Sequence, residues 1–104
     1  MGSRKSIDGL AVAFGHAVRS LRIKAGHNQE DFAHRCNMDR AYYGNIERGE
    51  HTPTIATLWR IASALNKRPR DVVAAVESDL RTLDSQSQPG IAPKLRGGAS
   101  RKGG

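Results

Sequence analysis

The 104-residue chain has one cysteine, few aromatic residues and no long apolar run. A lone Cys36 cannot close an intramolecular disulfide, which fits a protein of the reducing cytoplasm. No uninterrupted apolar run exceeds five residues, whereas a membrane-spanning helix needs roughly 20. The length leaves no room for a large catalytic architecture with a separate cofactor domain. We therefore expect a small cytoplasmic protein without a membrane partner.

Acidic residues are outnumbered, since 10 Asp and Glu stand against 17 Lys and Arg, for a net charge of +7. A basic excess indicates an anionic partner, of which nucleic acid is the commonest and a membrane surface the main alternative. Residues 1–7 contribute +2 and residues 85–104 contribute +4, whereas residues 8–84 contribute only +1. A folded domain over residues 8–84 is therefore nearly neutral, and to bind an anion it must carry its basic side chains on one face and its acidic side chains on another.

Patterns typical of metal sites and catalytic centres are missing from the sequence. The four histidines, at positions 16, 27, 34 and 51, show no i, i+4 spacing, and one cysteine cannot build a structural zinc site. No glycine-rich loop follows a strand, and no nucleophile has an evident base beside it. We therefore predict a protein that is not an enzyme and has no metal, cofactor or small-molecule ligand.

Helical periodicity is strong in the first third of the chain. Apolar residues recur there at steps of three and four and form one stripe, which comprises Leu10, Phe14, Val18, Leu21 and Ala25. Asp8 is the expected N-cap of this helix and Gly26 its C-terminal stop. We expect residues 1–7 to be a flexible N-terminus.

Capping residues mark two short helices that follow. Asn28 caps a helix that runs to Cys36, where the thiol is expected to pack in the core. Asn37 tolerates the left-handed turn that comes next. Asp39 then caps a third helix, which Gly49 ends.

Two more helices complete the predicted domain. Thr54 caps a fourth helix that Asn66 ends, with an apolar face of Ile55, Leu58, Ala62 and Leu65. Trp59 is expected to pack at the rim of the core beside Leu58 and Ala62, with an anchor at a partner surface as the alternative. Pro69 opens a fifth helix with an apolar stripe of Val72, Val73, Val76, Leu80 and Leu83. Residues 85–104 are rich in Gly, Pro and Ser and lack acidic residues, so we expect a disordered basic tail. The fold class is all-α, a compact bundle of five helices.

The second and third predicted helices carry the most specific pattern. A short helix, a turn and a second capped helix, with the small Ala33 where two helices approach closely, match the helix-turn-helix unit. The segments QEDFA (29–33), DRAYYGNIERG (39–49), PT (53–54) and LWRIASAL (58–65) resemble the lambda-repressor-like, or Xre-type, helix-turn-helix regulators. The Asp-Arg-x-Tyr start at position 39 is most similar to restriction-modification controller proteins.

The resemblance implies a set of DNA contacts. The start of the third helix would enter the major groove, where Arg40 can bind guanine through two hydrogen bonds and Asn45 can pair with adenine. The amide of Gln29 would meet a phosphate. The full expected set is Gln29, Arg40, Ala41, Tyr42, Asn45, Arg48, His51 and Thr52. Ala41 would pack on a thymine methyl or simply make room, and Tyr42 and Asn45 could reach a phosphate instead of a base. A merely solvated polar residue is the alternative for Gln29, Arg40, Asn45, Arg48, His51 and Thr52.

The resemblance also implies a structural ion pair and a dimer interface. Glu47 is expected to be largely covered and to pair with Arg22 of the first helix. Family members often pair through the fifth helix, which places a homodimer interface at Val73, Val76, Leu80 and Leu83, with core packing alone as the alternative. A homodimer would present two recognition helices about 34 Å apart, as a pseudo-palindromic site requires.

Two residues depart from the family pattern in the third helix. Tyr43 replaces the usual Ile or Val facing the core, so its hydroxyl needs a partner. Gly44 replaces a residue that is often Ser, at a cost of about 1 kcal/mol relative to alanine. The details of recognition are therefore expected to differ from those of the family.

The sequence as a whole predicts a DNA-binding transcriptional regulator, a repressor or autoregulator, that acts as a homodimer on a pseudo-palindromic operator at the nucleoid. Two alternatives stay open: a general nucleic-acid or protein-bridging module, and an antitoxin-type autorepressor. Selection of binding sites from a random duplex pool would separate a sequence-specific regulator from a general binder.

Overall fold

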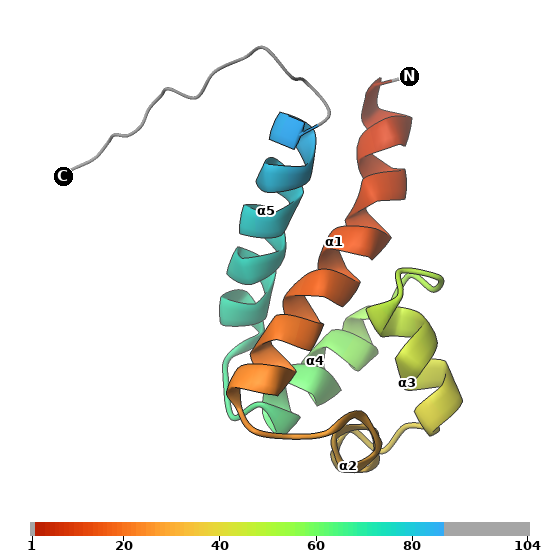
Figure 1. Cartoon of the computed structure of the whole chain (residues 1–104), viewed down its shortest axis with the longest axis vertical. Helices are drawn as coiled ribbons and strands as arrows, with labels where there is room; N and C mark the ends of the chain where they lie inside the picture. The colour runs from red at the N-terminus through yellow and green to blue at the C-terminus, as the bar shows by residue number, and fades with distance from the viewer. Residues whose placement is uncertain (1, 87–104) are drawn as a thin grey trace, which may run out of the picture.

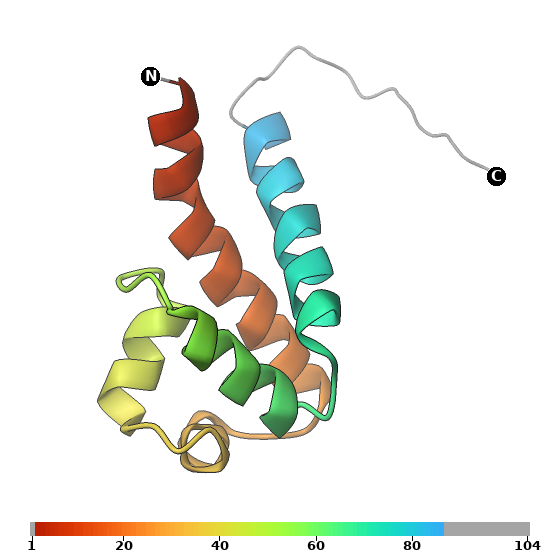
Figure 2. The same ribbon diagram turned by 180° about the vertical axis from the view of Figure 1, so that it is seen from behind.

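The computed structural model describes residues 2–86, with side chains described over residues 9–83, and this part of the chain holds five helices and no strand. The helices are α1 (Gly2–Lys24), α2 (Gln29–Arg35), α3 (Arg40–Glu47), α4 (Ile55–Ala64) and α5 (Pro69–Gln86). The two long helices, α1 and α5, run antiparallel and side by side, and the three short helices gather around the C-terminal half of α1 (Figure 1, Figure 2). The predicted all-α class is confirmed.

The three side-chain caps predicted for the short helices are present. Asn28 Oδ1 accepts the backbone N–H of Asp31 at 2.8 Å at the start of α2. Asp39 Oδ2 accepts two N–H groups of the first turn of α3, at 3.0 and 3.2 Å. Thr54 Oγ1 accepts the N–H of Thr57 at 3.1 Å and opens α4. Each cap satisfies N–H groups that the helix itself leaves unpaired, so the boundaries are set locally.

Left-handed residues end the helices at the expected places. Asn37 and Asn66 both have φ of 59°, after α2 and α4. Gly26 follows α1 with φ of 85°, and Gly49 follows α3 with φ of 77°. Residue types other than Gly, Asn and Asp are strained in this region, which explains the residues found there.

The start of the chain differs from the prediction. α1 begins at Gly2, so Asp8 lies inside the helix and the prediction that it is the N-cap is wrong. Residues 2–7, expected to form a flexible N-terminus, are helical. They contain no proline, and an existing helix gains one hydrogen bond for each residue added. At the other end α5 continues to Gln86, and the rest of the predicted basic tail, residues 87–104, lies outside the described residues.

The core fills the space enclosed by all five helices. Its largest fully buried side chains are Tyr43, Phe32, Ile46, Ile61, Val18, Val72 and Cys36. On α1 the buried face is centred on Phe14 and Val18, whereas Leu10 and Ala25 of the predicted stripe are exposed. The small side chains of Ala13 and Ala17 face the core instead, because α1 is crossed closely by neighbouring helices.

Helix α4 presents apolar residues on two sides, and only one side faces the core. Ile61, Ala62 and Leu65 are buried, while Ile55 and Trp59 are exposed. The predictions that Trp59 packs in the domain and that Ile55 lies on the core face are therefore wrong. Periodicity shows that a helix has apolar faces, but contacts with other helices decide which of them is covered.

A close backbone approach between α1 and α3 positions the second half of the helix-turn-helix. A Cβ atom added to Gly15 of α1 would lie 2.3 Å from the carbonyl oxygen of Ile46 and 2.5 Å from that of Glu47. No side chain fits there, so α1 and α3 touch backbone to backbone at Gly15. This contact, which no sequence pattern indicated, sets the direction in which α3 projects from the domain.

Candidate nucleic-acid interface

Helix α3 has one buried and one exposed face. Tyr43 and Ile46 are fully buried and point into the core. Arg40 and Ala41, in the first turn, are exposed, and Tyr42 is 37 % exposed. Asp39 caps this turn by accepting its backbone N–H groups and makes no bond to the outward side chains. The side chains of Arg40, Ala41 and Tyr42 can therefore contact a partner. The first turn of α3 is therefore an exposed surface on a fixed support.

A buried polar network anchors the other end of α3. The Arg22 guanidinium on α1 donates to both carboxylate oxygens of Glu47, with Nε 2.6 Å from Oε2 and Nη2 3.2 Å from Oε1. Arg22 Nη1 also donates to the carbonyl of His27 at 2.8 Å. Gln29 Nε2 donates to Glu47 Oε1 at 3.0 Å, and the Tyr43 hydroxyl donates to Oε2. The network thus joins α1, α2 and α3 through one carboxylate, and the expected Arg22–Glu47 pair is present.

The network keeps its members in their charged or donating forms. Burial raises the pKa of Glu47, but hydrogen bonds from Arg22, Tyr43 and Gln29 outweigh burial, and the pKa lies below its ordinary value. The hydrogen bond to Glu47 raises the pKa of Arg22 despite its burial. Burial, and then the hydrogen bond to Glu47, raises the pKa of Tyr43 far above its ordinary value. Tyr43 therefore stays a phenol that donates to the carboxylate, which is the hydroxyl partner that the sequence required.

The loop after α3 extends the exposed surface. His51 and Thr52 are exposed, and the rings of Tyr42 and His51 lie with centroids 5.3 Å apart and 33° between their planes. The first turn of α3 and the loop before α4 consequently form one surface. It carries Arg40, Ala41, Tyr42, His51 and Thr52, five of the eight expected DNA contacts.

Exposed Arg48 and half-buried Asn45 form a second cluster beside that surface. Arg48 Nη2 donates to the side-chain oxygen of Asn45. Arg48 Nε donates to Glu50 Oε2 at 3.2 Å. The prediction that Arg48 contacts DNA did not consider Glu50, although this residue lies only two positions further along the chain. A phosphate that binds Arg48 would have to compete with the Glu50 carboxylate.

Gln29 lies apart from the other expected contacts. Its amide nitrogen donates to buried Glu47, and its Oε1 lies 3.5 Å from the position of a Cβ on Gly44. The side chain therefore serves the internal network through one N–H of its amide, and the second N–H of the same nitrogen is the one that a phosphate could accept. The nearby Gly44 leaves room for Gln29 on one side and for Arg48 on the other.

The residues expected at a dimer interface are not all available. Val76 is 5 % exposed and belongs to the core. Leu80 and Leu83 are half-buried and pack against the core, while Val73 is exposed. A partner that covers α5 would contact Val73 directly, but it would find Val76 already covered.

Two further features concern other kinds of site. Among the side chains described, those of residues 9–83, no three His, Cys, Asp or Glu come together as metal ligands would. None of the five described helices is both long and apolar enough to cross a bilayer.

Comparisons with known proteins agree with the fold and the motif. A protein-family model described as Helix-turn-helix matches residues 18–72, more than half of the chain. Control protein C.BamHI of Bacillus amyloliquefaciens is 32 % identical over 65 residues, which cover 62 % of this chain and 80 % of that protein. The restriction-modification controller protein C.AhdI of Aeromonas hydrophila is 35 % identical, with a TM-score of 0.58 over 60 % of this chain and 94 % of that one.

A third relative has been solved on DNA. The restriction-modification controller protein C.Esp1396I, as a tetramer in complex with its natural 35 base-pair operator, is 26 % identical with a TM-score of 0.64. The match covers 69 % of this chain and 95 % of that one.

Proposed function

Because this chain belongs to the helix-turn-helix family, we propose that it is a transcriptional regulator that binds a pseudo-palindromic DNA operator as a homodimer. One observation carries the proposal: the first turn of α3 exposes Arg40, Ala41 and Tyr42 on a helix whose other face is buried and hydrogen-bonded. Reading base edges in the major groove requires such a helix, exposed at its start and rigidly supported behind.

The exposed side chains suit different parts of a duplex. The Arg40 guanidinium can donate to O6 and N7 of one guanine, and the Ala41 methyl can pack on a thymine methyl. Tyr42, with His51 and Thr52 beside it, offers donors to the sugar-phosphate backbone. In this arrangement α3 specifies the bases, and the loop after it fixes the register of the protein on the DNA.

The similarity to C.BamHI and C.AhdI supports a more specific role. We propose that the chain controls the expression of a restriction-modification operon, including its own gene, at the nucleoid in the cytoplasm. The protein acts by occupying DNA, so it needs no catalytic residue, cofactor or small-molecule ligand.

The test is a selection of binding sites from a random duplex pool by the full chain at physiological salt. We expect enrichment of a pseudo-palindrome with half-sites one helical turn apart. Arg40→Ala should then lose about 10- to 100-fold in affinity for the selected site and relax the preference at one base pair of each half-site. Arg19→Ala, which removes an exposed arginine of α1, is the matched control and should keep that preference.

Two results would contradict the proposal. One is a selection that enriches no palindrome, and the other is equal binding to RNA and to duplex DNA. Both together would favour a general nucleic-acid module, whose affinity depends on salt but not on sequence.

A further inference from the structure

Tyr43 brings a hydroxyl group into the core at a position where the family pattern has Ile or Val. The side chain is fully buried, and its ring lies edge-on to that of Phe32, with centroids 5.4 Å apart and 62° between their planes. Packing therefore fixes the ring, and the hydroxyl donates to Glu47, one helical turn further along α3. Tyrosine thus gives the carboxylate a rigid donor, which an aliphatic side chain cannot supply.

The two carboxylate oxygens of Glu47 face different partners. Oε2 accepts from Tyr43 and, at 2.6 Å, from Arg22 Nε. Oε1 accepts from Gln29 Nε2 at 3.0 Å and from Arg22 Nη2 at the longer distance of 3.2 Å. The Glu47 side chain is only 3 % exposed, so these four hydrogen bonds set its orientation. Because both oxygens belong to one rigid group, a donor that fixes Oε2 also fixes the place at which Oε1 meets Gln29.

The amide group of Gln29 has one donor inside the protein and one left over. Its nitrogen donates one hydrogen to Glu47 on the buried side of the residue. An amide group is planar with two N–H bonds, so fixing one of them fixes the direction of the other. Since Gln29 is half-buried, the second N–H is the donor left for the exposed side.

Gly44 leaves space in which this donor and a cation can act together. The position of a Cβ on Gly44 lies 3.5 Å from Gln29 Oε1 and 3.3 Å from Arg48 Nη1. Both side chains therefore border the same residue of α3, one from α2 and one from the end of α3 itself. A phosphate that accepts from Gln29 would lie within reach of the Arg48 guanidinium.

We infer that Tyr43 is a positioning residue for DNA binding, which orients the amide group of Gln29 through Glu47 so that the second N–H meets a phosphate of the operator. The inference rests on the proposed function, in which the chain binds an operator. It gives a fully buried side chain an effect on DNA affinity without any contact with DNA.

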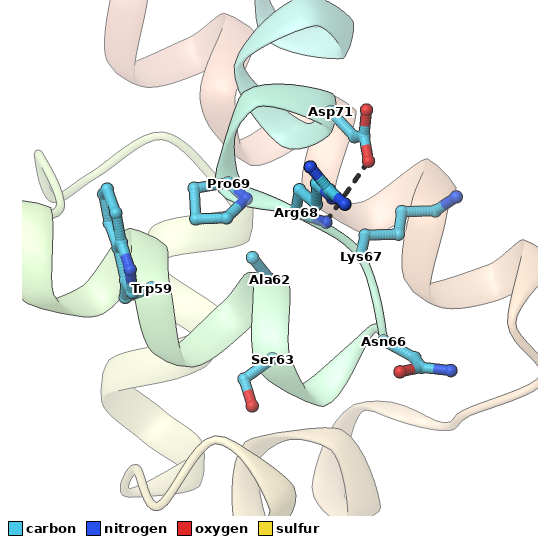
Figure 3. Close-up of a pocket in the computed structure, with 8 residues that line it drawn as sticks. All are labelled: Trp59, Ala62, Ser63, Asn66, Lys67, Arg68, Pro69 and Asp71. Carbon is cyan, nitrogen blue, oxygen red and sulfur yellow. Dashed lines mark hydrogen bonds between the residues drawn. The ribbon is translucent and has the colours of Figure 1, made fainter.

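Hydrogen exchange of side-chain amides tests the first step in the free, ¹⁵N-labelled full chain. The sequence has three glutamines, and the signal pair that is lost in Gln29→Ala assigns the amide of Gln29. The proton donated to Glu47 should exchange more slowly than those of Asn66, an exposed residue whose amide group stands clear of the other residues drawn (Figure 3). Tyr43→Phe keeps the ring and removes the hydroxyl, so it should speed exchange of the Gln29 proton about 5-fold and leave Asn66 unchanged.

Operator duplexes with one methylphosphonate each test the second step. This group replaces a charged phosphate oxygen by a methyl group and so removes a hydrogen-bond acceptor. The Gln29 phosphate is the position at which the replacement weakens binding of the unaltered chain about 10-fold and that of Gln29→Ala less than about 2-fold. With Tyr43→Phe, the loss at this phosphate should fall to about 3-fold, while the losses at all other phosphates stay as in the unaltered chain.

Ile46→Val is the matched control, because it removes one methyl group from the same fully buried face of α3 and no polar group. It and Tyr43→Phe should each lower the melting temperature by about 5 °C. Only Tyr43→Phe should change the exchange of Gln29 and the loss at its phosphate. The double variant Gln29→Ala/Tyr43→Phe should bind the operator no more weakly than Gln29→Ala, because Tyr43 acts through Gln29.

Three results would overturn the inference: an unchanged exchange rate of the Gln29 proton in Tyr43→Phe, a full loss at the Gln29 phosphate in that variant, or the same reduction of this loss in Ile46→Val. A failure of the proposed function gives a different result. If the random pool enriches no operator, the proposed function is contradicted. The exchange rates of the free protein then still support or overturn the orientation of Gln29 by Tyr43.

Discussion

Two arginine–glutamate pairs flank the C-terminal end of α3, and they differ mainly in burial. The side chains of Arg22 and Glu47 are 10 % and 3 % exposed, and their closest atoms are 2.6 Å apart. The side chains of Arg48 and Glu50 are 57 % and 56 % exposed, and their closest atoms are 3.2 Å apart. The same two residue types thus occur once as an internal anchor and once as a surface contact.

The difference separates stability from recognition along one short helix. A buried carboxylate without its partner costs several kcal/mol, because no water replaces the lost hydrogen bonds. An exposed pair contributes at most about 1 kcal/mol, since each charge is already well solvated. Residues on the inner side of α3 therefore hold the helix in place, and residues on the outer side can change without unfolding it.

Breaking the inner pair should give the largest effect. Glu47→Leu leaves the Arg22 charge and the Tyr43 hydroxyl buried without their acceptor, and should cost about 3–5 kcal/mol in unfolding free energy. Arg22→Met combined with Glu47→Leu removes both charges and should be more stable than either single variant. Urea unfolding followed by circular dichroism measures all three. A double variant no more stable than the singles would show that the two charges do not stabilise each other.

The second-largest effect is expected at acidic pH, where protonation of Glu47 should weaken its pairing with Arg22. The pKa of Glu47 is lower in the folded chain than in the unfolded chain, so the group stabilises the fold above its unfolded pKa of about 4.3. That stability is lost as the pH falls from this value through the lowered folded pKa. The stability of the unaltered chain relative to the Arg22→Met/Glu47→Leu variant should therefore be constant near neutral pH and decline below about pH 4.3. A difference that does not change with pH would contradict the assignment.

Breaking the outer pair should have the smallest effect on stability. Arg48→Met and Glu50→Leu should each change the unfolding free energy by less than about 1 kcal/mol. Their effects on DNA should be opposite, because Arg48→Met removes a charge that can bind phosphate and Glu50→Leu removes its competitor. Titration of the selected operator at several salt concentrations should show weaker binding for Arg48→Met, with a salt slope smaller by about one, and tighter binding for Glu50→Leu.

The sequence predicted those parts of the fold that depend on neighbouring residues. Asn28, Asp39 and Thr54 cap their helices as expected, because a cap needs only a side-chain oxygen within three residues of its donor. Asp8 was misassigned because a capping residue is also tolerated inside a helix. The resemblance supplied the Arg22–Glu47 pair, and the i, i+4 spacing of Tyr43 and Glu47 could have predicted the hydroxyl partner as well.

Features that depend on how distant segments pack were not predictable in the same way. Gly15 contacts the backbone of α3, more than 30 residues away in the chain, and no local pattern specifies that crossing. The exposed side of α4, with Ile55 and Trp59, has the same apolar spacing as its buried side. For the candidate site, the sequence identified the outward residues of α3 but not that Gln29 turns inward or that Glu50 engages Arg48.

Because Cys36 is buried at the end of α2, its alkylation by a thiol reagent can be used to measure how often the protein opens. The side chain is 1 % exposed, and burial raises the pKa of its thiol to about 11, so a thiol reagent meets neither an accessible nor an ionised sulfur. Alkylation can then proceed only through molecules in which the helix-turn-helix has opened. The labelling rate of this single native thiol thus reports opening events directly, without an added dye or an engineered residue, both in the free protein and on its operator.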